Sequence, residues 1–121
     1  MSQPRIVLGF DFGLKNIGVA IGQELTSSAN QLTVITAREG IPHWNEIVTL
    51  IQQWNTQLLV VGLPLNMDGT EQKMTATARK FGNRLSAQSH LQVIWQDERL
   101  STYEALEQLG ISNKGQARRR R

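Results

Sequence analysis

The most constraining feature of the sequence is a continuous apolar stretch that begins at Leu58 and is halted by Pro64. A strand without polar side chains on either face must be covered on both sides, which is typical of a central parallel strand in an α/β sheet. Ile6 to Phe12 is a second short, mainly apolar stretch, and it stops at Gly13. We therefore expect a sheet built around two buried strands.

Three further β-prone stretches complete the predicted sheet. Ile17 to Ile21 is bounded by glycines, and the four residues 13–16 are the right length for a hairpin loop that joins it to the first strand. A third strand is expected over residues 32–38, where β-branched side chains recur. Leu91 to Trp95 form the last one.

Between these strands the apolar residues recur with the period of a helix. After Pro42, which suits the first position of a helix, they fall at offsets of 3, 4, 7 and 10 from Trp44. A third helix is predicted from a capping box at Ser101 and Glu104 to a C-cap at Gly110. The second helix lies between these two, contains Gly82 as a weak point, and carries the stripe Met74, Ala78, Phe81 and Leu85.

The predicted order of elements is β-β-β-α-β-α-β-α, three meandering strands followed by alternating helices and strands. This order predicts an α/β fold with one mixed, five-stranded sheet flanked by helices. The 121 residues suit a single domain, which we expect to span residues 1–115, with 116–121 as a basic tail.

The positive charge is concentrated at one end of the chain. Lys and Arg number 13 against 10 Asp and Glu, but the last four residues, from Arg118 on, are all arginines. The remaining 9 basic and 10 acidic residues nearly balance, so the high pI alone does not indicate a nucleic-acid-binding surface. The lack of cysteine excludes a thiol nucleophile. With no long apolar run and no secretory signal, we expect a cytoplasmic protein without a membrane span.

Asp11 is the first candidate for chemistry. It lies at the carboxyl end of a hydrophobic strand, where α/β sheets place their ligands. Burying a carboxylate there is costly unless it has a partner or a cation. The alternative is that Asp11 only caps the hairpin turn that follows.

Asp97 and Glu98 are the second candidates, since they lie between the last predicted strand and a helix. An acidic first turn favoured by the helix dipole would explain them without any function. Together with Asp11, however, they place carboxylates at one edge of the sheet. Carboxylates that converge on a cleft are typical ligands of Mg²⁺ or Mn²⁺, which can polarise a phosphodiester and activate water.

The third candidate is the segment 62–70, which contains Asn66 and precedes a predicted helix. The N-terminus of that helix could offer N–H groups to a phosphate. An ordinary connection with Asp68 or Thr70 as the N-cap is the alternative. The segment lacks the glycines and lysine of a Walker motif, which excludes a nucleotide P-loop.

Basic side chains supply candidate phosphate contacts. Lys15 follows the first strand, and Arg79 and Lys80 lie on the polar side of the second helix. Such a pattern most often means a solvated surface, but it could also contact a nucleic-acid backbone. His43 and His90 have no partner at a suitable spacing, and we expect each to be a surface or capping residue.

Four motifs in this order resemble the YqgF family, also called RuvX, whose members are described as Holliday junction resolvases and pre-16S rRNA nucleases. The resemblance extends from about Ile6 to Gly115. It is carried by the strings LGFDFG at 8–13, IGVA at 17–20, VVGLPLNMDGT at 60–70 and DERLST at 97–102.

The resemblance implies a ribonuclease H-like fold and a metal-dependent nuclease that matures the 5′ end of pre-16S rRNA or resolves Holliday junctions. It implies that Asp11 and Glu98 are metal-binding and catalytic carboxylates with Mg²⁺ or Mn²⁺ as the cofactor. The nucleic acid would be contacted by Lys15, Asn66, Arg79, Lys80 and Arg99.

One position departs from the family pattern. Members continue beyond Gly115 into a helix that opens with an aspartate, the third carboxylate, whereas this sequence has Arg118 at about that place. A cation there would oppose metal binding unless Asp97 or Asp68 substituted. Lack of that helix would also uncover part of the sheet and favour a homodimer.

Three functional hypotheses follow. The first is a nuclease with Asp11 and Glu98 at its metal site. The second is a nucleic-acid-binding protein of the same fold without catalysis, favoured by the missing third carboxylate and the arginine tail. The third, an actin-like ATPase, requires two related domains and is disfavoured by the length of the chain.

Overall fold

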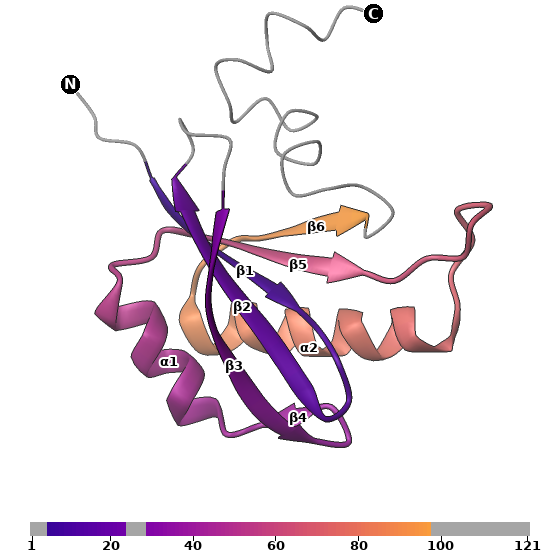
Figure 1. Cartoon of the computed structure of the whole chain (residues 1–121), viewed down its shortest axis with the longest axis horizontal. Coiled ribbons are helices and arrows are strands. Elements are labelled where there is room, and N and C mark those ends of the chain that lie inside the picture. The colour runs from indigo at the N-terminus through magenta and orange to yellow at the C-terminus, as the bar shows by residue number, and fades with distance from the viewer. Residues whose placement is uncertain (1–4, 24–28, 98–121) are drawn as a thin grey trace, which may run out of the picture.

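A computed structural model describes residues 5–23 and 29–97 of the chain and shows one mixed sheet with two helices (Figure 1). The sheet has six strands in the order β4-β3-β2-β1-β5-β6. The elements in chain order are β1 (Ile6–Asp11), β2 (Asn16–Gln23), β3 (Ala29–Arg38), β4 (Ile41–Pro42), α1 (Trp44–Gln53), β5 (Leu58–Leu63), α2 (Lys73–Ser89) and β6 (Val93–Asp97).

The strand pairing confirms the predicted α/β class. Strands β1, β2, β3 and β4 form an antiparallel meander, whereas β1 pairs parallel with β5 and β5 pairs parallel with β6. Strand β5 is buried along its whole length, as its apolar sequence predicts. The parallel half of the sheet therefore has strand β5 at its centre.

The predicted count of five strands is wrong, because a short sixth strand precedes α1. Glu39 and Gly40 both have positive φ angles and turn the chain back on β3. Pro42 lies in β4 and does not open the helix, which has His43 as its N-cap. Proline is tolerated in a strand at the edge of a sheet because it has no N–H to donate.

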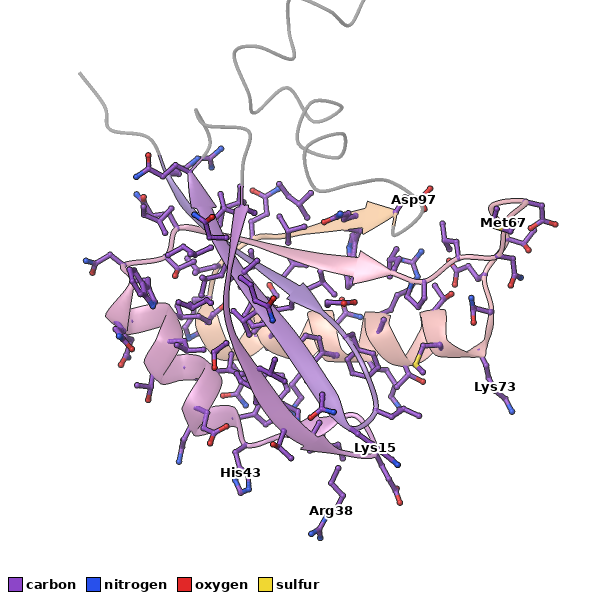
Figure 2. All side chains as sticks on the ribbon, in the orientation of Figure 1. Lys15, Arg38, His43, Met67, Lys73 and Asp97 are labelled. Atoms are coloured by element: carbon purple, nitrogen blue, oxygen red, sulfur yellow. The ribbon has the colours of Figure 1, made fainter. Side chains whose placement is uncertain are left out.

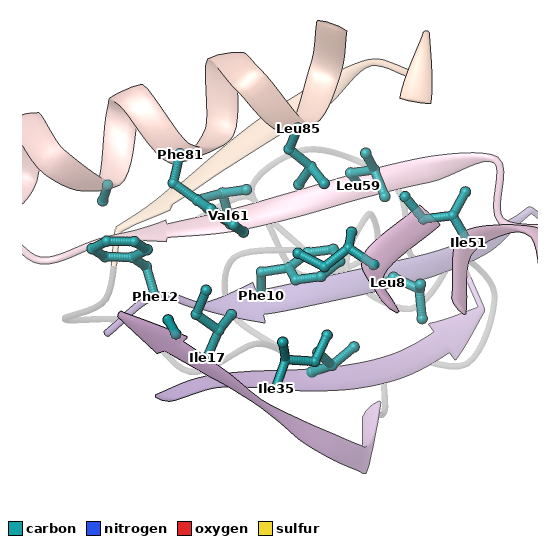
Figure 3. Close-up of a cluster of buried hydrophobic side chains, with 14 of the residues drawn as sticks. Leu8, Phe10, Phe12, Ile17, Ile35, Ile51, Leu59, Val61, Phe81 and Leu85 are labelled. Carbon is teal, nitrogen blue, oxygen red and sulfur yellow. The ribbon is translucent and has the colours of Figure 1, made fainter. Parts of the chain in front are cut away.

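Both helices pack on the same face of the sheet, which we call the helix face (Figure 3). Side chains of β1, β2, β3 and β5 alternate toward this face and meet Ile47 and Ile51 of α1. From α2, Phe81 contacts three aromatic rings, with centroids 5.9, 5.3 and 5.5 Å away. These rings belong to Phe10, Phe12 and Trp44.

Gly82 is a close-packing position and not merely a weak point of α2. A Cβ atom built there would lie 2.3 Å from the Cη2 atom of Trp95. The missing side chain thus lets the indole ring of β6 lie directly against the helix.

The opposite face of the sheet, which we call the second face, carries a smaller apolar cluster around β1, β5 and β6. Among the described elements, no helix packs on it (Figure 1). Its members are Val7, Leu58, Val60 and Ile94.

Two further expectations concern a third helix and a membrane span. The third helix predicted between Ser101 and Gly110 lies outside the described residues. Neither of the two described helices is long and apolar enough to cross a membrane.

Candidate active site

Three parallel strands end together and form the carboxyl edge of the sheet, as predicted (Figure 1). Strand β1 ends at Asp11, β5 at Leu63 and β6 at Asp97. In the β5–β6 ladder Leu63 pairs with Asp97, and Phe10 of β1 pairs with Val61. This edge is where open α/β sheets bind ligands.

Asp11 lies on the second face of the sheet. Its neighbours Phe10 and Phe12 are buried in the core on the helix face, and side chains alternate along a strand. The Asp11 side chain is exposed to solvent, so the expected burial of this carboxylate is wrong. Within residues 5–23 and 29–97 it accepts no hydrogen bond, and it therefore does not cap the β1–β2 turn.

Glycines keep the surface around Asp11 open. Asp11 pairs with Gly18 of β2, and a Cβ atom built on Gly18 would lie 3.6 Å from the Asp11 Cβ. A Cβ built on Gly9, on the same face, would meet no atom within 4 Å. Within the described residues, the positions of Gly9 and Gly18 beside Asp11 therefore carry no side chains on this face.

Asp97 lies on the other face of the sheet. Trp95 packs against α2, so alternation along β6 puts Asp97 on the helix face and Gln96 on the second face. The backbones of Asp11 and Asp97 are two strand spacings apart, about 10 Å. The structure therefore does not bring these two carboxylates together.

Glu98 and Arg99 lie outside the described residues. Among residues 5–23 and 29–97, no three His, Asp or Glu side chains gather closely enough to hold a metal ion. Asp11 is thus the predicted metal ligand whose surroundings the structure describes.

The connection between β5 and α2 is a small hairpin held by its own polar groups. Leu65 and Glu71 form an antiparallel bridge, and the backbone N–H of Asn66 donates to the carbonyl of Thr70 at 2.8 Å. The Asn66 side-chain amide donates to the Thr70 hydroxyl at 3.0 Å. The side chain of Asn66, a predicted substrate contact, therefore braces this loop.

Asp68 also has a local role in this loop. Its Oδ1 atom accepts from the Thr70 N–H at 2.9 Å and from the Thr70 hydroxyl at 2.6 Å. Neither residue is the N-cap of α2, contrary to one of our expectations. The N-cap is Gln72, which forms a capping box with Thr75, and the Thr75 hydroxyl also donates to the Pro64 carbonyl.

Arg79 joins α2 to its surroundings on the helix face. Its Nη2 atom lies 2.6 Å from Oε2 of Glu71, and its guanidinium stacks 5.6 Å from the centre of the Trp95 ring. Lys80, the next residue, is exposed on α2. Both predicted phosphate contacts therefore belong to the layer that covers the helix face, opposite to the Asp11 carboxylate.

Lys15 lies beyond Asp11 at the same end of β1, in the loop that leads to β2 (Figure 2). Gly13 permits this tight loop, because a Cβ there would lie 2.5 Å from the Asn16 carbonyl oxygen. The Lys15 carbonyl accepts from the Ala37 N–H at 2.8 Å, which anchors the loop to β3. The backbone that carries this exposed side chain is thus anchored at the carboxyl end of β1.

His43 and His90 have the capping positions that the sequence predicts. His43 is the exposed N-cap of α1, and His90 is the C-cap of α2 with a φ angle of 63°. Sequence reasoning did not single out Gly9 and Gly18 as parts of the site. A glycine inside a strand can signal a close approach of another molecule, but the strand pairing was needed to place both beside Asp11.

Comparisons with known proteins agree with this architecture. Residues 5–121 match the family described as "RuvX: Holliday junction resolvase". A protein of Nitrosococcus oceani named "Putative pre-16S rRNA nuclease" is 61% identical over 118 residues, which cover 98% of this chain and 78% of that protein. A protein of the same name from Shewanella oneidensis is 60% identical over 84% of this chain and 72% of its own length.

A solved structure shows the same fold at low sequence identity. The chain resembles RuvC of T. thermophilus in complex with a Holliday junction substrate, with a TM-score of 0.54 and 13% identity. The match covers 77% of this chain and 63% of RuvC. The predicted ribonuclease H-like fold is thereby confirmed.

Proposed function

Because the chain belongs to the RuvX family of Holliday junction resolvases, we propose that it is a nuclease that hydrolyses phosphodiester bonds in structured nucleic acid. The name of its curated relatives favours pre-16S rRNA as the substrate, with branched DNA as the second choice. The observation that carries the proposal is the exposed Asp11 carboxylate on an open, glycine-lined surface at the carboxyl edge of the sheet.

The residues at this edge fit a divalent metal. Asp11 offers hard carboxylate oxygens of the kind that Mg²⁺ and Mn²⁺ prefer, and the space over Gly9 leaves room for the waters that Mg²⁺ retains. Glu98 lies outside the described residues, and its assignment rests on the DERLST motif at 97–102, which resembles the family pattern. We assign Asp11 and Glu98 as the ligands.

When bound, the metal would polarise the phosphodiester and lower the pKa of an attacking water. Asp11 holds a negative charge at a fixed place on the rigid end of β1. Gly9 and Gly18 let the nucleic-acid backbone approach that charge closely. Lys15, at the same end of β1, offsets the repulsion between the carboxylate and the incoming phosphates.

The substitution Asp11→Asn tests this assignment. It removes a charge from an exposed position, so we expect the fold and melting temperature to be retained. Cleavage of a pre-16S rRNA fragment in the presence of Mn²⁺ should fall by at least about 100-fold, the usual effect of losing one electrostatic group in an active site. A four-way DNA junction assayed in parallel identifies the preferred substrate.

The control is Glu46→Gln, which removes a carboxylate from α1 on the helix face. We expect it to cleave like the parent protein. Unchanged cleavage by the Asp11→Asn variant would reject the role of Asp11.

The same assay separates the second hypothesis, a nucleic-acid-binding protein without catalysis. This hypothesis is based on Arg118, which stands at about the place where the family pattern has an aspartate. Binding that persists in EDTA, with no product formed by the parent protein in Mg²⁺ or Mn²⁺, would favour that function over hydrolysis.

A further inference from the structure

A hollow lies beside the short strand β4, separate from the carboxylate at the end of β1. Its volume is about 360 Å³. We call it the β3–β4 hollow, and it is lined by Thr36, Ala37, Arg38, Ile41, Pro42 and His43.

Strand pairing relates this hollow to Asp11. Asp11 pairs with Gly18, which pairs with Val34 of β3. Because alternate residues of a strand share a face, Thr36 and Arg38 lie on the second face with Val34 and therefore with Asp11. Ala37, between them, packs into the core on the helix face. Two exposed side chains of the hollow, Thr36 and Arg38, thus lie on the same face of the sheet as the Asp11 carboxylate.

The chemistry of the hollow suits an anion. Arg38 is exposed, and among residues 5–23 and 29–97 it forms no ion pair. His43 makes no side-chain capping bond to α1, so its imidazole can turn toward a ligand. Figure 2 shows Arg38 and His43 extending from the same end of the molecule as Lys15.

Acidic groups nearby do not line the hollow. Glu39 follows Arg38 in the turn and Glu46 lies in the first turn of α1, but neither contributes to the walls. The polar groups among the lining residues are a guanidinium, a hydroxyl and an imidazole, all common partners of phosphate oxygens, and the rest of the wall is the apolar surface of Ala37, Ile41 and Pro42.

We propose that the β3–β4 hollow binds a backbone phosphate of the nucleic acid at a distance from the cleaved bond, with Arg38 as its main contact. This inference rests on the proposed function. Two strand spacings and four residues along β3 separate Arg38 from Asp11, about 16 Å. At a rise of about 3.4 Å per base pair, that span covers about five base-pair steps along the axis of a duplex. The hollow therefore fixes the register of the substrate over Asp11.

The test is the salt dependence of binding by the Arg38→Gln variant. A fluorescent pre-16S rRNA fragment is titrated in EDTA at several KCl concentrations, and binding is followed by anisotropy. Loss of one phosphate contact should reduce the slope of log K against log [KCl] by about 0.7–0.9. The affinity should then fall about tenfold at 50 mM KCl and about fourfold at 200 mM KCl.

The matched variant is Lys80→Gln, which removes one positive charge from α2 on the opposite layer. We expect the salt slope of this variant to equal that of the parent protein. All variants should keep the melting temperature of the parent. Equal slopes for Arg38→Gln and the parent would overturn the proposal, as would a slope change confined to Lys80→Gln or a parent protein that does not bind the fragment.

Failure of this inference is distinguishable from failure of the proposed function. Binding is measured without metal, so it does not depend on cleavage. If Arg38→Gln lowers the salt slope as predicted but the parent protein cleaves neither substrate, the phosphate site is supported and the nuclease function is rejected.

Discussion

At the scale of single residues, the side chains of β1 alternate between the core and the face that carries the candidate metal ligand. Phe10 and Phe12 pack into the core, while Asp11 between them reaches solvent on the second face. The sequence was enough to place Asp11 at the end of a strand. Its exposure was not predictable, because it depends on which face of the sheet the helices cover, and both described helices pack on the face opposite to Asp11.

Gly82 gives a stability prediction at the same scale. At an exposed position inside a helix, replacing glycine by alanine raises the free energy of unfolding by about 1 kcal/mol. Here the new methyl group would lie 2.3 Å from the Trp95 ring, and overpacking of this kind costs about 1–3 kcal/mol. We expect Gly82→Ala to lower the free energy of unfolding in urea by about 1 kcal/mol.

The control for this prediction is Gly9→Ala, where the added methyl group meets no atom within 4 Å. Its free energy of unfolding should stay within about 0.5 kcal/mol of the parent value. A Gly82→Ala protein more stable than the parent would show that Trp95 does not pack closely on the helix.

At the scale of elements, long periodic stretches were predictable and short ones were not. The helical stripe that begins at Trp44 and the apolar run of β5 both form the expected elements. The two-residue strand β4 was missed, since Pro42 is compatible with either a helix start or an edge strand. What decides is the turn at Glu39 and Gly40, which leads the chain back along β3.

The hairpin between β5 and α2 gives a prediction about local motion. Glu71→Gln removes the ion pair with Arg79, whose two side chains are 51% and 41% exposed. Such exposed pairs contribute at most about 1 kcal/mol to global stability. We expect a small change in unfolding free energy but faster amide hydrogen exchange at Asn66 and Gly69, whose N–H groups close the loop.

The comparison variant is Lys73→Gln, which changes one charge at the start of α2 and leaves the Glu71–Arg79 pair intact. Its loop amides should exchange like those of the parent. Identical exchange rates in the Glu71→Gln protein would mean that the ion pair does not hold the hairpin.

At the scale of the whole molecule, the two faces of the sheet have different roles. Both described helices and the aromatic cluster around Phe81 stabilise the helix face. The second face presents Asp11 and, in our proposal, the β3–β4 hollow to the nucleic acid. Arg79 and Lys80, which the sequence suggested as phosphate contacts, lie on the helix side of the sheet. Their placement was not predictable, because the helical period says nothing about which face of the sheet a helix covers.

The central claim is that Asp11 holds the divalent metal of a nuclease on the second face. Paramagnetic broadening of backbone amide signals by substoichiometric Mn²⁺ tests it most directly. We predict selective broadening at Gly9, Asp11 and Gly18 in the parent protein and its loss in the Asp11→Asn variant, while the amides of α1 stay sharp in both. Broadening that persists in the variant, or that is centred on the carboxylate of Asp68, would contradict the account.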